Sequence, residues 1–501
     1  MPLLFDRADA QASNRAHECY RQLFAHGKVQ GVLPYRVPRA SKKEERVIEF
    51  MVQYGHSLGL ETIQDRTGNV VIKKPATPGM ENRQTVIMQS HLDMVHQKNG
   101  DRNFDFATQG IEMFVDGDWV RANGTTLGAD NGIGVATIMA ILASSTIVHP
   151  AIEAMFTIDE ETGMTGAKEL DPSNFTGTIL LNLDTEEDDE LTIGCAGGID
   201  TNSIYNYKQH PIAKDHLAFQ VTVKGLLGGH SGMDIHKGRG NANKLMNRIL
   251  NAALKSSDLQ LCTVDGGSLR NAIPRESKAV VAIPAAQKDT FLAAFTDFSA
   301  VLKEEYKSIE TAMNISIEET ELPEHGMSKL DFLKIVNAIY SLPNGVFRMS
   351  PDIKDLVEAS SNLARVIIKG GEFITQSLQR SSVESTKDDV AFAVGAALEN
   401  MGCDVSRSGD YPGWKPNADS DILRLMTKLY QTAFNAEPNV NACHAGLECG
   451  ILGAHLPGMD MISFGPTIHG AHSPDECVKI SSVQKFWGYL LQVLQEIPEK
   501  K

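Results

Sequence analysis

Two kinds of apolar pattern divide the chain, and they constrain its fold more than any other feature. Short, nearly continuous apolar runs occur close to its beginning and again close to its end, at residues 86–88, 154–158, 179–181 and 461–464. Such runs are typical of central strands in a mainly parallel sheet covered by helices on both faces. In the middle of the chain, residues 219–224 alternate between apolar and polar, which indicates a sheet with one solvent-facing side.

These patterns predict an α/β protein with an insertion. We expect a doubly wound, mainly parallel sheet in a catalytic domain built from residues 1–197 and 411–501, with an α+β lid domain inserted at residues 198–410. Glycine and proline cluster at both boundaries, as is typical of chain crossings between domains. The insert contains two sets of predicted strands and helices, at about 215–320 and 328–410, which indicates two α+β halves.

Helical periodicity occurs in both predicted domains. Apolar residues recur at helical spacing over residues 245–253 of the insert, and again from about residue 483 to 497 near the end of the chain. Ser385 and Asp388 have the spacing of a capping box, which predicts the start of another helix at that point.

The composition excludes several classes of protein. The 63 acidic residues outnumber the 47 basic ones and give a formal net charge of −16, whereas nucleic-acid binders are typically basic. No run approaches the roughly 18 apolar residues of a membrane span, and the first 22 residues lack the apolar core of a secretion signal. The seven cysteines form no CxxC pair, which is typical of reduced thiols. We therefore expect a cytoplasmic protein with neither a nucleic acid nor a membrane as partner.

Acidic residues follow each of the four apolar runs, and histidines also follow the first and the last of them. In an open α/β sheet, ligands bind beyond the carboxyl ends of the strands, so these side chains are expected to meet at one edge. A fifth segment adds an aspartate in a glycine-rich turn before a helix. The residues concerned are His91 and Asp93, Glu160 and Glu161, Asp184, His472, and Asp130 in the glycine-rich turn.

This concentration of carboxylates predicts a metal site. Each motif has an ordinary structural alternative, such as acids at a helix N-terminus, but that alternative does not explain why all of them follow strands. Burying an unpaired anion costs about several kcal/mol of folding free energy, and a bound cation removes that cost. Two imidazoles with three carboxylates contain too much nitrogen for a calcium cage and too much oxygen for a cysteine-type zinc site. We expect two divalent ions, zinc first, with manganese and cobalt as alternatives.

The same residues, with their neighbours, resemble the motifs of the M20 metallopeptidases. The similarity extends from about residue 35 to the C-terminus, and several longer stretches are similar to the aminoacyl-histidine dipeptidase branch of that family. These stretches are HLDMV, RANGTTLGADNGIG, FTIDEETGMTGA, LLNLDTEE and GGHSGMDIHKGRGNAN, together with the late segment Gly465-Pro…His472-Ser-Pro-x-Glu476.

The resemblance implies a ligand set. His91 and Asp184 would hold one ion, Glu161 and His472 would hold the other, and Asp130 would bridge them.

The resemblance also implies catalytic and substrate-binding roles. Asp93 would lie behind His91 and fix its tautomer, and Glu160 would be the general base. From the lid, His230 would reach the scissile carbonyl, while Asn271 and Arg380 would contact the substrate.

The activity implied is hydrolysis of dipeptides with a free N-terminus and preferably a C-terminal histidine, including β-alanyl-histidine. The nucleophile would be a water molecule shared by the two ions. A broader di- and tripeptide aminopeptidase or an aminoacylase of the same fold are the alternatives. A peptide-binding protein without activity is disfavoured, because Glu160 and all five ligands are present. On family grounds we expect a homodimer that acts on small peptides.

Overall fold

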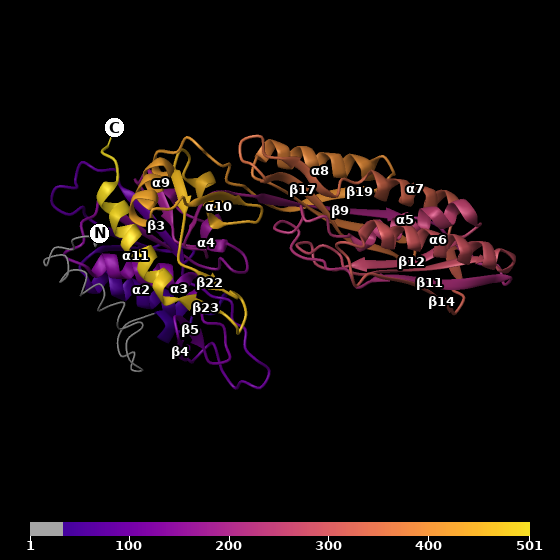
Figure 1. The fold of residues 1–501 in the computed structure, drawn as a ribbon, viewed down its shortest axis with the longest axis horizontal. Helices are drawn as coiled ribbons and strands as arrows, with labels where there is room; N and C mark the ends of the chain where they lie inside the picture. Colours follow the sequence, from indigo (N-terminus) through magenta and orange to yellow (C-terminus); the bar gives the residue numbers. More distant parts are fainter. Residues whose placement is uncertain (1–33, 501) are drawn as a thin grey trace. The chain divides into compact units, whose positions relative to one another are not determined.

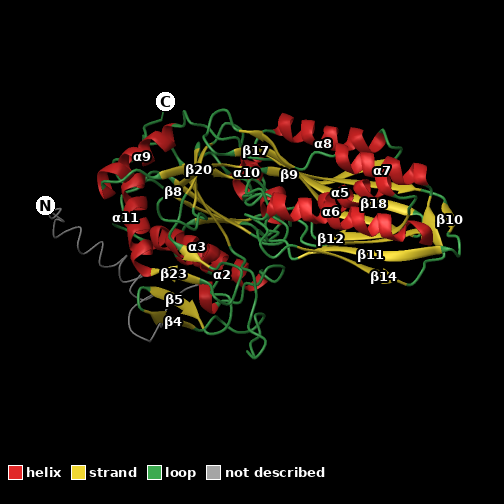
Figure 2. Ribbon diagram, turned by 45° about the vertical axis from the view of Figure 1, so that its right-hand side comes forward, coloured by secondary structure: helices red, strands yellow, loops and turns green. Residues whose placement is uncertain are grey.

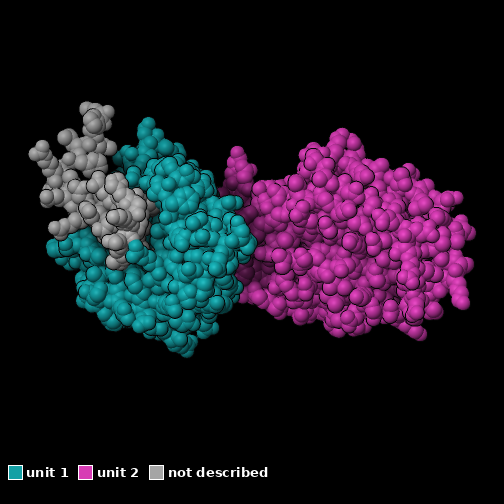
Figure 3. Space-filling view, turned by 90° about the horizontal axis from the view of Figure 1, so that it is seen from below, with its two compact units in different colours: residues 1–194, 416–442, 448–501 teal, residues 195–415, 443–447 magenta. Residues whose placement is uncertain are grey.

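The computed structural model describes residues 34–500, which divide into two compact units (Figure 3). Unit 1 comprises residues 34–194, 416–442 and 448–500, and unit 2 comprises residues 195–415 and 443–447. The sequence places the boundaries three to five residues away, after 197 and before 411. It gives no indication that the short segment 443–447 returns to unit 2. Cys19 and the first part of the chain lie outside the described residues.

Unit 1 is built on an eight-stranded mixed sheet (Figure 1, Figure 2). The four central strands are mutually parallel, and they contain the four apolar runs. Strands β1, β2 and β8 pair antiparallel with their neighbours at the two sides, which the sequence did not predict. The α/β class is confirmed. In sheet order the strands are β1 (Glu61–Gln64), β2 (Val70–Lys74), β6 (Ile152–Thr157), β3 (Val86–His91), β7 (Ile179–Asn182), β21 (Asp460–Ser463), β8 (Glu190–Cys195) and β20 (Asn439–Cys443).

Helices pack on this sheet and complete unit 1. Helix α3 packs on β3, α9 and α10 pack on β21, and α11 packs on α9. Most side chains of α3 are buried, because a helix of small apolar residues can be covered on all sides. The helices are α2 (Glu45–Ser57), α3 (Ala129–Ala143), α4 (Thr165–Lys168), α9 (Asp421–Phe434), α10 (Glu448–His455) and α11 (Ile480–Glu496). A second, small sheet has the order β22 (Ile468–His469), β23 (Cys477–Lys479), β5 (Trp119–Ala122) and β4 (Met113–Asp116).

Unit 2 contains one antiparallel sheet assembled from the two predicted sets of strands. The sets join where β12 pairs with β17, and β9 adds to the second set. In sheet order the strands are β14 (Asn314–Thr320), β11 (His216–Lys224), β13 (Ser277–Pro284), β12 (Gln260–Gly267), β17 (Val357–Lys369), β18 (Glu372–Ser381), β9 (Gly197–Asn206) and β19 (Asp404–Tyr411), with β16 (Gly345–Met349) beside β17. A short pair is formed by β10 (Gln209–Pro211) and β15 (His325–Met327).

Four helices cover the sheet of unit 2 and form its core with it. Helix α5 packs on β11, β12, β13 and β17, while α8 packs on β9, β17, β18 and β19. Phe219, Val221 and Val223 of the alternating run are buried in this core, as the period of two predicts. The helices are α5 (Ala242–Ser256), α6 (Lys288–Tyr306), α7 (Lys329–Ser341) and α8 (Glu384–Glu399).

The predicted capping box in this unit is wrong. Helix α8 already begins at Glu384, so Ser385 lies inside its first turn, and the N-cap residue Val383 has no side-chain hydrogen bond. The reason is a local hydrogen bond: β18 ends at Ser381, and the Ser381 hydroxyl accepts from the backbone N–H of Val383, so the chain turns before Ser385. Within residues 34–500, no helix has both the length and the apolar content to cross a membrane.

The packing of α6 against β11 predicts a stability effect. Phe291 is 1% exposed, and its ring centroid lies 5.5 Å from that of Phe219. We expect Phe291→Ala to lower the free energy of unfolding by about 3–5 kcal/mol, because it removes a buried ring and leaves a cavity. Urea unfolding followed by circular dichroism measures the change. Phe347→Ala is the control, since Phe347 is 42% exposed, and an equal effect of the two substitutions would contradict this packing.

Candidate metal centre

The ends of the central strands bring the predicted metal ligands together in unit 1. His91 is the last residue of β3 and lies in register with Thr157, the last residue of β6. Asp184 follows β7 by two residues. Asp130 enters from the first turn of α3, after Gly128, whose φ of 68° is in the left-handed region that favours glycine. The parallel register therefore delivers these side chains to one edge of the sheet.

The donor atoms form two groups that share one carboxylate. His91, Asp130 and Asp184 make one group, and Asp130, Glu161 and His472 make the other, with the donor atoms of each group within 4.8 Å of one another. Asp130 contributes Oδ1 to the first group, 3.1 Å from Nε2 of His91. It contributes Oδ2 to the second, 3.1 Å from Nε2 of His472. A carboxylate with one oxygen toward each group has the arrangement of a bridge between two cations.

The charges at this edge require compensation. Burial disfavours a charged His91, but the Asp184 carboxylate and its other acidic neighbours outweigh this and raise the pKa of His91 well above its usual value. Hydrogen bonds with Asp130 and Glu161 raise the pKa of His472 to about 11. Burial opposes ionisation of Asp130, yet the two imidazoles lower its pKa. Protons on the histidines therefore occupy the place of positive charge that dications would fill.

An unpartnered atom also fits a metal pair. Oε2 of Glu161 lies 2.9 Å from Nε2 of His472. Its other oxygen, Oε1, is buried and has no hydrogen-bond partner among residues 34–500. Two nitrogen donors and three carboxylates, one of them incompletely satisfied, are suitable ligands for two divalent ions.

Asp93 links His91 to the segment that carries the two glutamates. It is fully buried, and Oδ1 lies 3.4 Å from Nδ1 of His91. Its oxygens accept hydrogen bonds from the backbone N–H groups of Glu160 (3.0 Å) and Glu161 (3.3 Å) and from the Ser41 hydroxyl (2.8 Å). One carboxylate thus orients the imidazole and fixes the position of the neighbouring turn.

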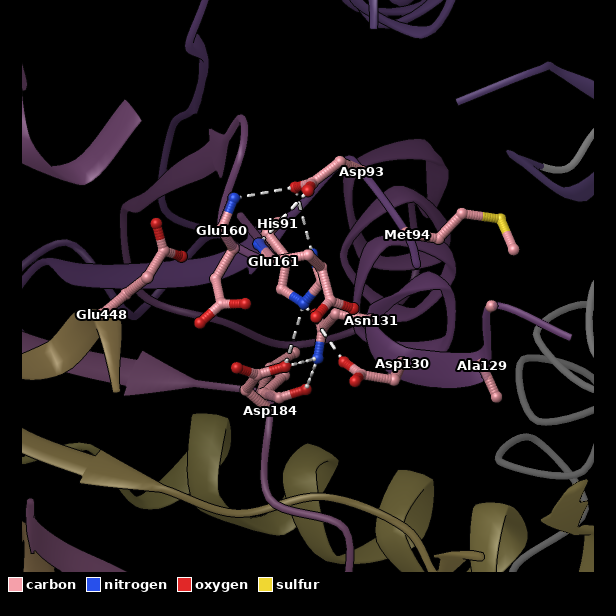
Figure 4. Close-up of polar contacts among 12 residues, drawn as sticks. His91, Asp93, Met94, Ala129, Asp130, Asn131, Glu160, Glu161, Asp184 and Glu448 are labelled. Carbon is pink, nitrogen blue, oxygen red and sulfur yellow. Dashed lines mark hydrogen bonds and ion pairs between the residues drawn. The ribbon is translucent and has the colours of Figure 1, made fainter. Parts of the chain in front are cut away.

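Glu160 lies beside the ligands, within 4.8 Å of donor atoms of His91 and Glu161. Figure 4 shows its carboxylate directed toward the cluster. Burial, reinforced by the Asp184 and Glu448 carboxylates, raises the pKa of Glu160 well above its usual value, although His91 opposes the shift. A carboxyl group in such a place is suited to accept and return protons near neutral pH.

Asp159 has a structural function in this turn. Its φ of 57° lies in the left-handed region of the backbone. Its carboxylate forms an ion pair with Lys42 and accepts hydrogen bonds from the hydroxyls of Thr162 and Thr165. These contacts hold the turn in which Glu160 and Glu161 point in different directions.

Two further anchors of the Asp130 loop were missed from the sequence. Glu476 accepts hydrogen bonds from four successive backbone N–H groups, those of residues 127–130, at 2.7–3.3 Å. The guanidinium of buried Arg39 donates to the backbone oxygens of Leu92, Asp93 and Gly128. Glu476 stands in the quoted late motif and could have been suspected, whereas no motif pointed to Arg39.

The three predicted substrate residues lie in unit 2. Nδ1 of His230 accepts from the N–H groups of Gly232 and Met233. Burial, followed by the Arg380 cation, lowers the pKa of His230, so the neutral ring carries its proton on Nε2. Asn271 is exposed, and its backbone oxygen accepts from the N–H of Ser231 at 2.8 Å.

Arg380 is a buried cation whose hydrogen-bond partners are hydroxyl groups. It is 5% exposed, and it donates to the hydroxyls of Tyr411 (2.8 Å) and Ser231 (3.4 Å). No carboxylate among residues 34–500 forms an ion pair with it. Arg275, for which the sequence left a structural role open, donates through Nε to the backbone oxygen of Leu226.

His444 is a residue of unit 2 that the sequence analysis missed. Its Nε2 lies 2.7 Å from the Ser360 hydroxyl. Burial, followed by the nearby cation of Arg380, lowers the pKa of His444 to about 3, so this histidine is neutral.

Comparisons with known proteins agree with this architecture. Residues 221–310 match the family described as Peptidase dimerisation domain. The chain is 42% identical to the cytosol non-specific dipeptidase of Escherichia coli (strain K12) over 467 residues, which cover 93% of this chain and 96% of that protein.

Solved structures show the same fold. The aminoacylhistidine dipeptidase from Vibrio alginolyticus superposes with a TM-score of 0.88 at 44% identity, covering 93% of this chain and 96% of the other. The aminopeptidase PepT from Bacillus cereus, at 15% identity and a TM-score of 0.53, covers 97% of this chain and 98% of its own and is similar in fold alone.

The protonated histidines predict that metal binding releases protons. Because the pKa values of His91 and His472 are raised, both imidazoles carry a proton at pH 7 in the metal-free protein. An imidazole must lose its extra proton before it can bind a metal, so we expect about two protons to be released per pair of ions, and the affinity to increase with pH. Titration calorimetry with Zn²⁺ in buffers of different ionisation enthalpy counts these protons. Binding without proton release would contradict this ligand set.

Proposed function

Because the chain belongs to the M20 family of metallopeptidases, we propose that it is a two-metal dipeptidase acting on dipeptides with a free amino terminus. The observation that carries the proposal is the sharing of Asp130 between two donor groups. In this proposal His91 and Asp184 hold one ion, and Glu161 and His472 hold the other. The expected metal is zinc, with manganese and cobalt as alternatives of similar ligand preference.

The chemistry is divided between the metals and the residues around them. When bound, two dications acidify a water molecule and polarise the scissile carbonyl group. Glu160 accepts the proton of the attacking water and then donates it to the leaving amine, a role that its buried position and raised pKa support. Asp93 holds His91 and the backbone of the Glu160 turn in place, and a fixed base needs no rearrangement during the reaction.

Residues of unit 2 are proposed to bind the substrate. The N–H at Nε2 of neutral His230 is a suitable donor to the oxygen that becomes negatively charged at the carbonyl. Arg380 is proposed to bind the C-terminal carboxylate, because its guanidinium has only hydroxyl partners among the described residues and matches a carboxylate in shape and charge. Asn271, which is exposed, is proposed to bind the peptide backbone.

We propose a preference for histidine at the C-terminal position, including β-alanyl-histidine. The similar solved structure is an aminoacylhistidine dipeptidase, which favours this specificity. The relative from Escherichia coli is named a non-specific dipeptidase, so a broader di- and tripeptide aminopeptidase is the second candidate. An aminoacylase of the same fold would differ by needing no free amino group. The matched dimerisation-domain family and the cytosol relative support a cytoplasmic homodimer.

A substrate panel tests the activity. We expect release of free histidine from Xaa-His dipeptides by the metal-loaded protein, loss of activity on chelation, and recovery with Zn²⁺. Glu160→Gln should lower kcat by about 10²–10⁴-fold, since a general base contributes that much, with a smaller change in KM. A metal-loaded protein that hydrolyses no dipeptide would contradict the proposal, and equal rates on Xaa-His and other dipeptides would favour the non-specific alternative.

A second test concerns the carboxylate-binding role of Arg380. We expect Arg380→Ala to raise KM for dipeptides by about 10–100-fold, because a charge-assisted bidentate contact is lost. Dipeptide amides, which lack the carboxylate, should be poor substrates for both proteins and little affected by the substitution. Arg275→Ala is the matched control and should leave KM unchanged. Equal sensitivity of amides and free acids would contradict the assignment.

A further inference from the structure

A network of buried polar side chains crosses the parallel strands of unit 1, and the proposed mechanism does not use it. Its members come from α10, β6, β3, β7 and β21 in turn, and each is at most 1% exposed. They are Glu448, Thr157, Gln89, Asn182 and Ser463. Buried polar groups at or near the ends of strands that are otherwise apolar are costly unless each finds a partner.

The hydrogen bonds among these five side chains all have their donors and acceptors ordered in the same direction. Oε2 of Glu448 accepts from Nε2 of Gln89 (2.7 Å) and from the Thr157 hydroxyl (2.7 Å). The Thr157 hydroxyl in turn accepts from the same Gln89 nitrogen (3.1 Å) and passes this contact on to Glu448. The amide nitrogen of Asn182 donates to Oε1 of Gln89, and the Ser463 hydroxyl donates to Oδ1 of Asn182. The side-chain amides of Gln89 and Asn182 therefore both direct their nitrogen toward Glu448 and their oxygen away from it.

Glu448 determines this direction. An amide side chain has a donor end and an acceptor end of nearly equal shape, so packing alone does not orient it. Because Oε2 of Glu448 accepts, Gln89 must present its nitrogen there and its oxygen to Asn182. Asn182 must then present its nitrogen to Gln89. Glu448 thus sets the orientation of a residue that it does not contact.

These five polar side chains lie next to the candidate metal ligands. Side chains two residues apart on a strand point to the same face, and Gln89 precedes His91 by two positions on β3. Gln89 and Asn182 are direct neighbours in the register of β3 and β7, and Asn182 precedes Asp184 by two positions. Figure 4 shows Glu448 beside the Glu160 carboxylate.

We propose that Glu448 is a positioning residue of the dipeptidase reaction, acting as the acceptor that orders Gln89 and Asn182 beneath the metal ligands. This inference rests on the proposed function. The ordered amides hold the ends of β3 and β7, and these strand ends place His91 and Asp184. A small displacement of catalytic groups lowers the rate more than it lowers binding.

Two substitutions at this position separate its hydrogen-bond role from its volume. Glu448→Gln keeps an acceptor oxygen in the same place, whereas Glu448→Met keeps the volume and removes the acceptor. We expect E448M to lower kcat by about tenfold or more with KM within about twofold, and to weaken Zn²⁺ binding by about 10–100-fold, as loss of groups behind metal ligands does. E448Q should remain within about threefold of the unaltered protein in all three quantities.

A double-mutant cycle tests the transmission through Gln89. Glu448 and Asn182 share Gln89 as a partner, so the effects of E448M and Asn182→Leu on kcat should not be additive. The double variant should be little worse than the poorer single variant. Additive effects would show two independent structural roles and would overturn the proposal.

A matched control is available on the same sheet. Glu153 is also a buried carboxylate, 4% exposed, and it lies near the start of β6, where it accepts from the N–H groups of Thr176 and Gly177. Glu153→Gln and Glu153→Met should lower the thermal stability but leave kcat, KM and Zn²⁺ affinity unchanged. If E153M changes these quantities as E448M does, the effect is general loss of stability and the proposal fails.

The Zn²⁺ affinity, measured by competition with a chromophoric chelator, keeps this test separate from the proposed activity. If the unaltered protein binds Zn²⁺ but hydrolyses no dipeptide, the proposed function fails while the affinities still test Glu448. If E448Q is impaired as much as E448M, or if neither is impaired, the acceptor role is overturned. Should E448M not fold, Gln89→Met must weaken Zn²⁺ binding, and an unchanged affinity overturns the inference.

Discussion

The structure of unit 1 depends on one electrostatic constraint, the convergence of carboxylates at the carboxyl ends of parallel strands. Acidic groups this close repel one another and are costly to bury. The acidic neighbours raise the pKa values of His91 and His472, so a proton on either imidazole offsets part of that cost. Asp130 stands at the centre, with one oxygen for each side. The strand register, the glycine turn before α3 and the late loop with His472 all serve to keep this shared carboxylate in place.

The residues around the carboxylates hold them close together through hydrogen bonds to the backbone of the loops that carry them. Glu476 holds four successive N–H groups of the Asp130 loop, and Arg39 holds carbonyl oxygens on two segments. Asp93 holds the turn of Glu160. Each contact orders main chain on a loop that would otherwise be free to move, so the geometry of the donors is largely set before any ion arrives.

Periodicity and local motifs predicted the central strands and the helices of this fold better than the side strands of the sheet, the helix ends and the unit boundaries. The four apolar runs became the four parallel strands because burial on both faces leaves a pattern that needs no tertiary information. The antiparallel side strands and the return of residues 443–447 depend on contacts between distant segments, which a local pattern does not contain. The early start of α8 follows instead from the hydrogen bond between Val383 and Ser381. The same holds for the site. The proposed ligands His91, Glu161 and Asp184 follow strands and were visible as histidine and acidic residues at strand ends. Arg39 and Glu448 instead contact residues far away in the sequence.

The short segment 443–447 shows that the second unit is not a simple insertion. Its backbone oxygens at Cys443 and Ala445 accept from the N–H of Ala196, its His444 contacts Ser360, and the carbonyl of His444 lies where a side chain on Gly232 would be. Excision of residues 195–415 would leave these five residues without their partners. They would then form an unsupported connection from the end of β20 to the start of α10. An isolated unit 1 therefore requires two excisions and two new joints, and a chimaera that exchanges unit 2 must carry both pieces from the same parent.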